Sequence, residues 1–242
     1  MLFRSGNEIR FCQSYRFFCW GVAFRRYTLK ATVPLATTEI SMIRVLSLGD
    51  SYTIGEGVEI SERWPVQLAD GLRRRGIPTE DPLIIARTGW TTGDLQAGIS
   101  QSDPQGVYDL VTLLIGVNNQ YRGEDVEQYR QEFRLLLKQA INFAGNKRRA
   151  VLVISIPDWG VTPFARGLDH GQIAAEIESF NTVNRQEAKQ TGVVYIDITP
   201  ASRRAAQDAE LLASDGLHPS GVMYAEWVNL MLPIVVAIIG AR

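Results

Sequence analysis

The chain has 242 residues, a length that suits one α/β domain with a sizeable core and is short for two domains. Hydrophobic residues make up 45% of it and charged residues 21%, a composition that argues against disorder, collagen-like repeats and a coiled coil. With 25 Lys and Arg against 26 Asp and Glu, its net charge of −1 offers no overall attraction to nucleic acid or to an anionic membrane.

Residues 1–41 differ from the rest in composition, with six basic residues against two acidic ones. Arginines interrupt and close the aromatic stretch 11–24, so the uninterrupted apolar core of a signal peptide is missing. A strand-like run begins directly after Met42, which suggests Met42 as the natural start. We therefore expect residues 1–41 to be a basic extension that is poorly ordered or outside the fold, residues 42–242 to form the domain, and the protein to be cytoplasmic.

Cysteine and histidine are scarce in this chain. The two cysteines, Cys12 and Cys19, both precede the predicted domain, so neither a disulfide framework nor a cysteine-based zinc site is expected within it. The two histidines, His170 and His218, are far apart and belong to no metal-ligand motif. We expect no metal and no cofactor, and we expect His170 to be an ordinary loop residue.

Short apolar runs alternate with longer helical patterns along the domain. The runs are rich in Val, Ile and Leu, as in parallel strands covered on both faces, and comprise residues 43–48, 82–86, 109–116, 150–157 and 193–198. The helical patterns are residues 64–75, 126–144, 172–191 and 221–239. This order predicts a three-layer α/β/α sandwich around a five-stranded parallel sheet. Residues 230–239 contain Pro233 and fall well short of the roughly 20 residues needed to cross a bilayer, so we expect a core helix and no transmembrane span.

Ligands of such sheets bind beyond the carboxyl ends of the strands. The first strand ends in Gly49-Asp50-Ser51, which places a hydroxyl at that edge, in the position of a nucleophile. Two other interpretations compete: a phosphate-binding loop, and a turn in which Ser51 only caps a helix. The first lacks the Gly-Lys-Ser/Thr ending, and the α/β-hydrolase elbow Gly-x-Ser-x-Gly fails because position 53 is Thr.

A serine needs a general base, and the base needs an acceptor that fixes its tautomer. Asp215 and His218 stand three residues apart just before the last predicted helix, after the last strand of the sheet. In a turn of this length the carboxylate can accept from one ring nitrogen and leave the other free to face a hydroxyl. The pair therefore favours a catalytic role for His218 over that of a surface residue.

Four separated blocks together resemble the SGNH hydrolases, also called GDSL esterases and lipases. They are residues 49–52, Gly89 after the second strand, residues 116–119 after the third, and Asp215 with His218 and the proline that follows. Tyr52 stands where the family usually has Leu. The resemblance covers most of residues 43–220 and implies the flavodoxin-like sandwich of that family.

The resemblance implies a role for each matched residue. Ser51 would attack an acyl carbonyl, His218 would take its proton and return it to the leaving alcohol, and Asp215 would orient the imidazole. The backbone N–H groups of Ser51 and Gly89 and the side-chain amide of Asn118 would form the oxyanion hole. Asp50 is expected to brace the loop by hydrogen bonding.

Four neighbouring residues are candidates for contact with the substrate: Trp90, Asn119, Tyr121 and Arg122. The predicted function is a serine esterase that forms an acyl-enzyme. Short acyl or acetyl esters are favoured because no lid or long exposed apolar segment is evident. Carbohydrate O-deacetylase, thioesterase and lysophospholipase activities remain alternatives on the same fold, and a non-enzymatic binding module is disfavoured because every catalytic residue is present. We expect a small-molecule ester as partner and no nucleic acid; the sequence carries no signal for oligomeric state.

Overall fold

The computed structural model describes residues 4–5, 8–9 and 42–241. The chain divides into two compact units, Met1–Ile40 and Ser41–Arg242. The second unit holds the predicted domain.

The first unit has one described feature, a pair of two-residue strands. In it β1 (Arg4–Ser5) pairs antiparallel with β2 (Glu8–Ile9). The expectations for residues 1–41, which include both cysteines and a natural start at Met42, fall mainly outside the described residues and stay predictions.

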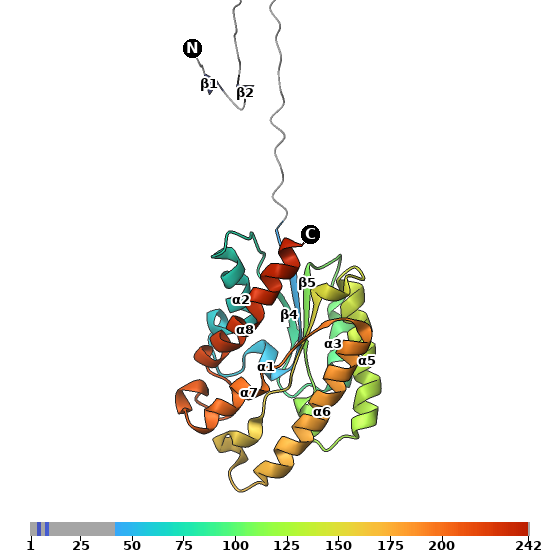
Figure 1. Cartoon of the computed structure of the whole chain (residues 1–242), viewed down its shortest axis with the longest axis vertical. Helices are drawn as coiled ribbons and strands as arrows, with labels where there is room; N and C mark the ends of the chain where they lie inside the picture. The colour runs from blue at the N-terminus through green and yellow to red at the C-terminus, as the bar shows by residue number, and fades with distance from the viewer. Residues whose placement is uncertain (1–3, 6–7, 10–41, 242) are drawn as a thin grey trace, which may run out of the picture. The chain divides into compact units, whose positions relative to one another are not determined.

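The second unit is built on a five-stranded parallel sheet, as the apolar runs predict, with the order β4-β3-β5-β6-β7 (Figure 1). Its strands are β3 (Val45–Gly49), β4 (Leu83–Ala86), β5 (Leu110–Leu114), β6 (Val151–Ile154) and β7 (Val194–Ile196). Each pairing is parallel; in β3, for example, Leu48 is in register with Ile85 of β4 and Leu113 of β5. Every strand begins one or two residues later than its predicted run, and β5, β6 and β7 also end earlier, where the chain turns into the loops at the carboxyl end of the sheet.

Strand position in the sheet determines how far each strand is buried. All residues of the central strands β3, β5 and β6 are buried, as predicted. The prediction is wrong for the two edge strands: Leu83 of β4 is 42% exposed, and Val194 and Tyr195 of β7 are only partly buried. An edge strand has a neighbour on one side only, so an apolar sequence there does not ensure burial.

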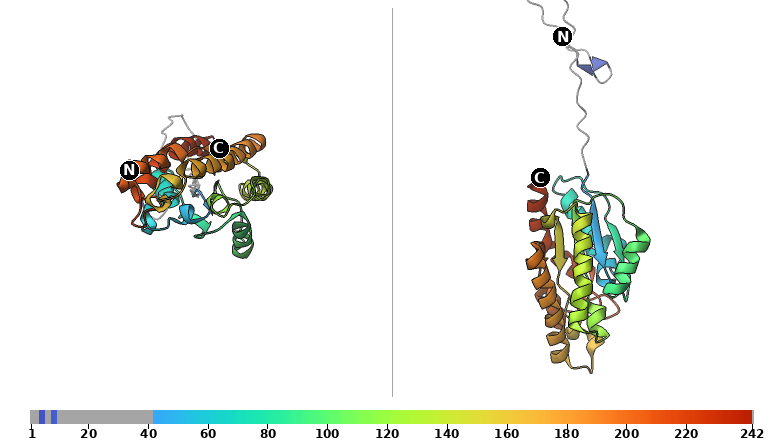
Figure 2. Two further views of the ribbon diagram at one scale, coloured as in Figure 1. Left: turned by 90° about the horizontal axis from the view of Figure 1, so that it is seen from below. Right: turned by 90° about the vertical axis from the view of Figure 1, so that its right-hand side faces the viewer.

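Helices cover both faces of the sheet. In Figures 1 and 2 one layer holds α2 (Trp64–Arg73) and α8 (Gly221–Gly240), and the opposite layer holds α3 (Thr92–Ser102), α5 (Val126–Phe143) and α6 (His170–Thr191). The predicted apolar face of α5 is confirmed, because five of its residues are buried: Tyr129, Phe133, Leu136, Leu137 and Ala140. His170 is the first residue of α6 and not part of a loop.

Helix α3 and several shorter elements were not predicted. Helix α3 contains two glycines and lacks a strong apolar face, but a capping box between Thr91 and Asp94 fixes its start. The remaining short helices are α1 (Ser51–Ile54), α4 (Val117–Tyr121) and α7 (Thr199–Ser202). The 3₁₀ turns are η1 (Ile60–Glu62), η2 (Arg148–Ala150), η3 (Trp159–Val161), η4 (Pro163–Ala165), η5 (Arg203–Ala206) and η6 (Ala209–Leu211). The short helices α1, α4 and α7 and the 3₁₀ turns contain too few residues to show a complete apolar period.

Helix α8 is the one helix among the described residues that is long and apolar enough to cross a membrane. One face of it packs on the core, where Trp227, Met231 and Val235 are fully buried, whereas Leu230 and Ile234 are exposed. The absence of a transmembrane span stays a prediction. It lies against α2 so closely that a Cβ on Gly71 would come within 2.8 Å of the Leu232 side chain.

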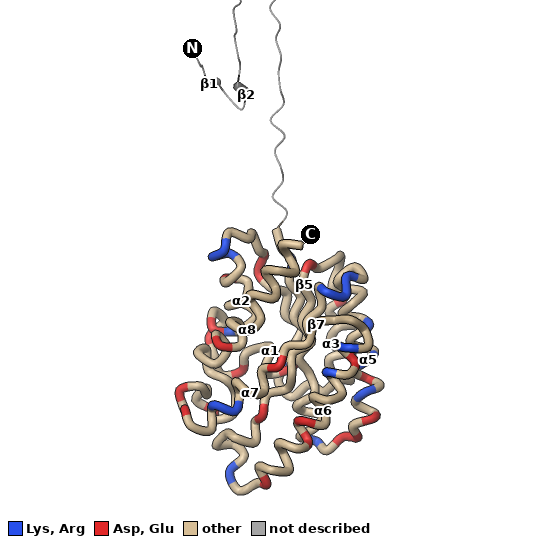
Figure 3. The backbone as a smooth tube through the Cα atoms, viewed as in Figure 1, with Lys and Arg blue, Asp and Glu red and all other residues tan. Residues whose placement is uncertain are grey.

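The loops that follow the carboxyl ends of the strands gather at the lower end of the domain in Figure 1. Acidic and basic residues are interspersed along the described backbone, without a face of one sign in the view of Figure 3. Because ligands of parallel sheets bind beyond the carboxyl ends of the strands, a functional site is expected in these loops.

Candidate active site

Ser51 is the first residue of α1, at the point where the buried strand β3 turns into a helix, and its residue surface is only 4% exposed. A Cβ on Gly49 would lie 2.1 Å from Oγ1 of Thr53, so only glycine allows this close turn. Asp50 caps the helix by accepting the backbone N–H of Tyr52 at 3.0 Å. The glycine and the capping carboxyl group thus hold Ser51 at the edge of the sheet.

Asp215 and His218 form the hydrogen-bonded pair that the sequence predicts. Nδ1 of His218 lies 2.6 Å from Oδ2 of Asp215, and Oδ1 of Asp215 accepts the backbone N–H groups of Leu217 and His218, each at 2.9 Å. The N–H of Ala213 donates to the His218 carbonyl at 2.7 Å and closes the turn. Because a carboxylate can only accept, Nδ1 carries the proton and Nε2 is left as the acceptor.

The surroundings of Asp215 favour its charged form. Burial acts to raise the pKa of Asp215, but hydrogen bonds from the His218 ring and from the backbone N–H groups of His218 and Leu217 outweigh it and leave the pKa below its ordinary value. Asp215 is therefore ionised at neutral pH and can stabilise positive charge on the imidazole.

The turn that carries His218 packs against α1 and the loop after it. The rings of Tyr52 and His218 lie 5.2 Å apart between centroids. On the same loop, a Cβ on Gly57 would lie 2.9 Å from Cβ of Ala213 and 3.6 Å from Oδ2 of Asp215. The short helix that begins with Ser51 and the distant Asp215–His218 turn are therefore neighbours in the fold.

Gly89 and Asn118 come from the loops after β4 and β5. Gly89 has a φ of 83°, and a Cβ there would meet no heavy atom within 4 Å. Nδ2 of Asn118 donates to the carbonyl of Trp90 at 2.9 Å, which leaves its second hydrogen for another acceptor. Nη2 of Arg122 donates to the Gly89 carbonyl at 2.7 Å. The two predicted donors are thus held in one hydrogen-bonded unit.

Asn119, next to Asn118 in the sequence, makes its hydrogen bonds in the interior of the protein. Its side chain accepts the N–H of Thr92 at 3.1 Å and donates to Oγ1 of Thr92 and to Glu124, each at 2.7 Å. Asn119 is fully buried. These contacts join the start of α3 to α4, and they leave the predicted contact of Asn119 with substrate without support.

The other three predicted contact residues differ in exposure. The ring of Trp90 covers Gly98 of α3, where a Cβ would lie 2.2 Å from it. Arg122 donates a hydrogen bond to the Gly89 carbonyl, and its Nη1 lies 3.8 Å from Oδ2 of Asp94. Tyr121 is 57% exposed. Of the four candidates Tyr121 presents the most open apolar surface, and contact with substrate stays a prediction for all of them.

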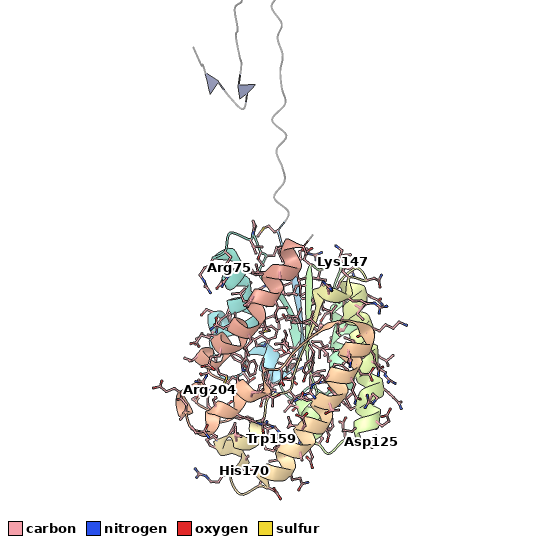
Figure 4. All side chains as sticks on the ribbon, viewed as in Figure 1. Arg75, Asp125, Lys147, Trp159, His170 and Arg204 are labelled. Carbon is pink, nitrogen blue, oxygen red and sulfur yellow. The ribbon has the colours of Figure 1, made fainter. Side chains whose placement is uncertain are left out.

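Two aromatic residues near the site were missed by the sequence reasoning. Trp159 and Phe164 follow β6, and with Tyr121 they form a cluster whose ring centroids lie 5.4 to 6.3 Å apart. The N–H of Phe164 donates to the carbonyl of Gly216 at 3.2 Å, within the Asp215–His218 turn. In Figure 4 Trp159 lies toward the end of the domain that carries His170, away from Arg75 and Lys147. The rule that ligands bind after parallel strands could have identified both residues.

An open pocket of about 550 Å³ lies between residues 161–170 and residues 205–212. Its wall includes Pro163, which lies next to Gly216 of the Asp215–His218 turn.

Among the described residues no group of three His, Cys, Asp or Glu side chains is placed to hold a metal ion.

Comparisons with known proteins identify the family and the fold. A sequence model of the GDSL-like lipase/acylhydrolase family matches residues 47–226. No curated protein matches the chain. Among solved structures the fold is similar to TesA, with 20% identity, a TM-score of 0.62 and coverage of 81% of this chain and 99% of the other.

Two further structures show the same fold. The lipase/acylhydrolase from Enterococcus faecalis has 21% identity and a TM-score of 0.60, covering 83% of this chain and 97% of its own. The acetyl xylan esterase AlAXEase has 18% identity and a TM-score of 0.61, covering 79% and 98%. Together with the family match across residues 47–226, these findings establish that the chain belongs to the GDSL-like lipase/acylhydrolase family.

Proposed function

We propose that this chain is a serine esterase that hydrolyses carboxylic esters of short acyl groups through an acyl-enzyme. The observation that carries the proposal is the Asp215–His218 pair. Nδ1 of His218 lies 2.6 Å from Oδ2 of Asp215, and the His218 ring packs against Tyr52 of the helix that begins with Ser51. An imidazole with its Nδ1–H held by a carboxylate is ready to accept a proton at Nε2, which is what an alcohol nucleophile requires.

In the proposed reaction Oγ of Ser51 attacks the ester carbonyl while Nε2 of His218 takes its proton. The carbonyl oxygen becomes negative and is stabilised by the N–H groups of Ser51 and Gly89 and by Nδ2 of Asn118. The carbon–oxygen bond to the alcohol then breaks, and His218 returns the proton to the departing oxygen. Water activated by the same imidazole releases the acid and restores Ser51.

The electrostatics of the pair suit this cycle. Imidazolium forms twice, during acylation and deacylation, and each time the ionised Asp215 lies against it. The hydrogen bonds that hold the loops after β4 and β5 together fix the oxyanion donors before negative charge develops. Donors already in place need no reorganisation in the transition state, which is the main source of their effect.

A carbohydrate O-deacetylase is the second candidate, and the aromatic cluster favours it. Tyr121 and Phe164 are about half exposed beside the Asp215–His218 turn, and flat aromatic faces pack well against the C–H face of a sugar ring. One solved structure of the same fold is an acetyl xylan esterase. In this version the acyl group is acetyl and the leaving alcohol is a sugar hydroxyl.

Two measurements test the proposal. Hydrolysis rates of p-nitrophenyl esters from acetate to palmitate and of acetylated xylo-oligosaccharides separate the short-acyl esterase, the deacetylase and a lipase; acyl-CoA and lysophospholipid substrates test the remaining alternatives. A p-nitrophenyl alkylphosphonate should add its phosphonyl group to the peptide that contains Ser51, as read by mass spectrometry. A label that appears on another residue, or an absence of hydrolysis of every ester, would overturn the assignment.

A further inference from the structure

Asp50 is a buried carboxyl group that the proposed reaction does not use. It stands directly before Ser51 and is fully buried. Oδ1 accepts the N–H of Tyr52, whereas Oδ2 is buried with no hydrogen-bond partner among the described residues. No Lys, Arg or His in that part of the chain forms an ion pair with Asp50. A buried carboxylate with one oxygen unpartnered and no counter-ion is costly.

The groups around Asp50 do not offset that cost. Phenols from three elements, Tyr52 of α1, Tyr129 of α5 and Tyr224 of α8, are all buried, and a negative charge on Asp50 helps to raise the pKa of each beyond the effect of burial. His218, which contacts Tyr52, is the nearby group that can become positive, but it is paired with Asp215. The other charges that reach these phenols belong to acidic residues: Asp158, Asp215 and Glu56.

We propose that Asp50 is a positioning residue that keeps its proton in the working enzyme, and that as a neutral carboxylic acid it holds the turn that presents Ser51. This inference rests on the proposed esterase function. The carbonyl oxygen of a neutral acid still accepts the N–H of Tyr52, so the helix cap is kept. A carboxylate one residue from Ser51 would in addition oppose the negative charge that develops on the substrate oxygen.

The direction of the titration agrees with this geometry. Burial raises the pKa of Asp50 to about 7, although the N–H of Tyr52 acts in the opposite sense. His218 must be neutral to accept the proton of Ser51, and Asp50 must be protonated. Activity should therefore fall on the alkaline side as Asp50 ionises.

The test compares Asp50→Asn with Asp50→Ala and with a matched control, Asp125→Asn. Asp125 also caps a helix, α5, by accepting the N–H groups of Glu127 and Gln128, but it is exposed. We would measure kcat for p-nitrophenyl acetate from about pH 5 to pH 9, corrected for spontaneous hydrolysis. The wild type and Asp125→Asn should both lose about tenfold or more between pH 7 and pH 9.

Asp50→Asn should keep kcat within a few-fold of wild type near pH 6.5 and should lose the alkaline decline, because it is neutral and can still cap α1. Asp50→Ala should lose about tenfold or more at every pH, because it has no acceptor for Tyr52. The proposal is wrong if Asp50→Asn is as damaged as Asp50→Ala, or if its pH profile matches that of wild type.

A second readout does not depend on turnover. The melting temperature of Asp50→Asn should exceed that of wild type near pH 8 and should approach it near pH 4.5, while Asp125→Asn shows no such divergence. If wild type hydrolyses no ester but this divergence is seen, the proposed function fails and the protonated state of Asp50 stands. If esters are hydrolysed and the divergence is missing, the inference about Asp50 fails alone.

Discussion

Asp50 and Asp215 lie in the two turns that make up the site, and their surroundings are opposite. Asp50 is fully buried, has one oxygen without a partner, and has its pKa raised to about 7. The side chain of Asp215 is 37% exposed, and its oxygens bind the His218 ring and two backbone N–H groups, which lower its pKa. The same side chain thus favours a neutral acid in one turn and an anion in the other, because the depth of burial and the hydrogen bonds that reach the carboxyl group both differ.

The largest effect on activity is expected at Ser51, the nucleophile of the proposed reaction. Ser51→Ala should reduce ester hydrolysis by about 10⁴-fold or more, because the nucleophile is removed while the fold is kept. Steady-state rates on p-nitrophenyl acetate check this, with Ser100→Ala, an exposed serine of α3, as the control. Wild-type turnover by a folded Ser51→Ala protein would end the assignment.

The contrast between the two carboxyl groups is sharpest when both are changed to Asn. Asp215→Asn should lower kcat by about 10³- to 10⁴-fold, because an amide no longer fixes the imidazole tautomer or stabilises its positive charge. Asp50→Asn should cost only a few-fold at near-neutral pH. Comparison of kcat for the two variants checks this; equal losses would mean that the difference in environment has no functional meaning.

Asn118→Ala should lower kcat by about 10²- to 10³-fold with a smaller change in KM, the usual cost of one oxyanion donor. Asn118 also holds the carbonyl of Trp90, so circular dichroism and thermal melting should accompany the kinetics. A variant that melts like wild type and turns over like wild type would remove Asn118 from the oxyanion hole.

Stability should respond to pH in opposite ways at the two carboxyl groups. Unfolded Asp50 loses its proton near pH 4 and folded Asp50 near pH 7, so wild-type stability falls as pH rises between these values. Asp50→Asn avoids this cost, which is at most about 4 kcal/mol above pH 7. The contribution of Asp215 is present above its unfolded pKa and is lost only as pH falls through its lowered folded pKa. Denaturant unfolding of both Asn variants at several pH values checks the two signs.

The smallest effect is expected at the aromatic cluster, outside both turns. Tyr121→Ala with Phe164→Ala should raise KM for acetylated xylo-oligosaccharides by a few-fold, roughly 1 kcal/mol, and leave p-nitrophenyl acetate nearly unaffected. The control is Leu168→Ala, because Leu168 lies between Phe164 and helix α6 and is 50% exposed. An equal change for both substrates would argue against a sugar-binding role.

Local sequence was sufficient for the central sheet and for the chemistry-bearing turns. Runs rich in Val, Ile and Leu identify β3, β5 and β6 because strands buried on both faces need no polar alternation. Asp215 and His218 pair within one short turn, so their spacing alone predicts the hydrogen bond that joins them. Helix α3 and the exposure of the edge strand β4 escaped prediction, since the first depends on a capping box and the second on which strands lie alongside.

The sequence by itself determined the residue types of the site and their order after successive strands, because chemistry and strand periodicity are local properties. Tertiary structure alone decided that Tyr52 meets His218, that Asn119 is buried and hydrogen-bonded to Thr92 and Glu124, and that Trp159 and Phe164 join Tyr121. It also decided the state of Asp50. Burial, missing partners and the pKa that follows depend on everything that packs around a side chain, and no short stretch of sequence contains that information.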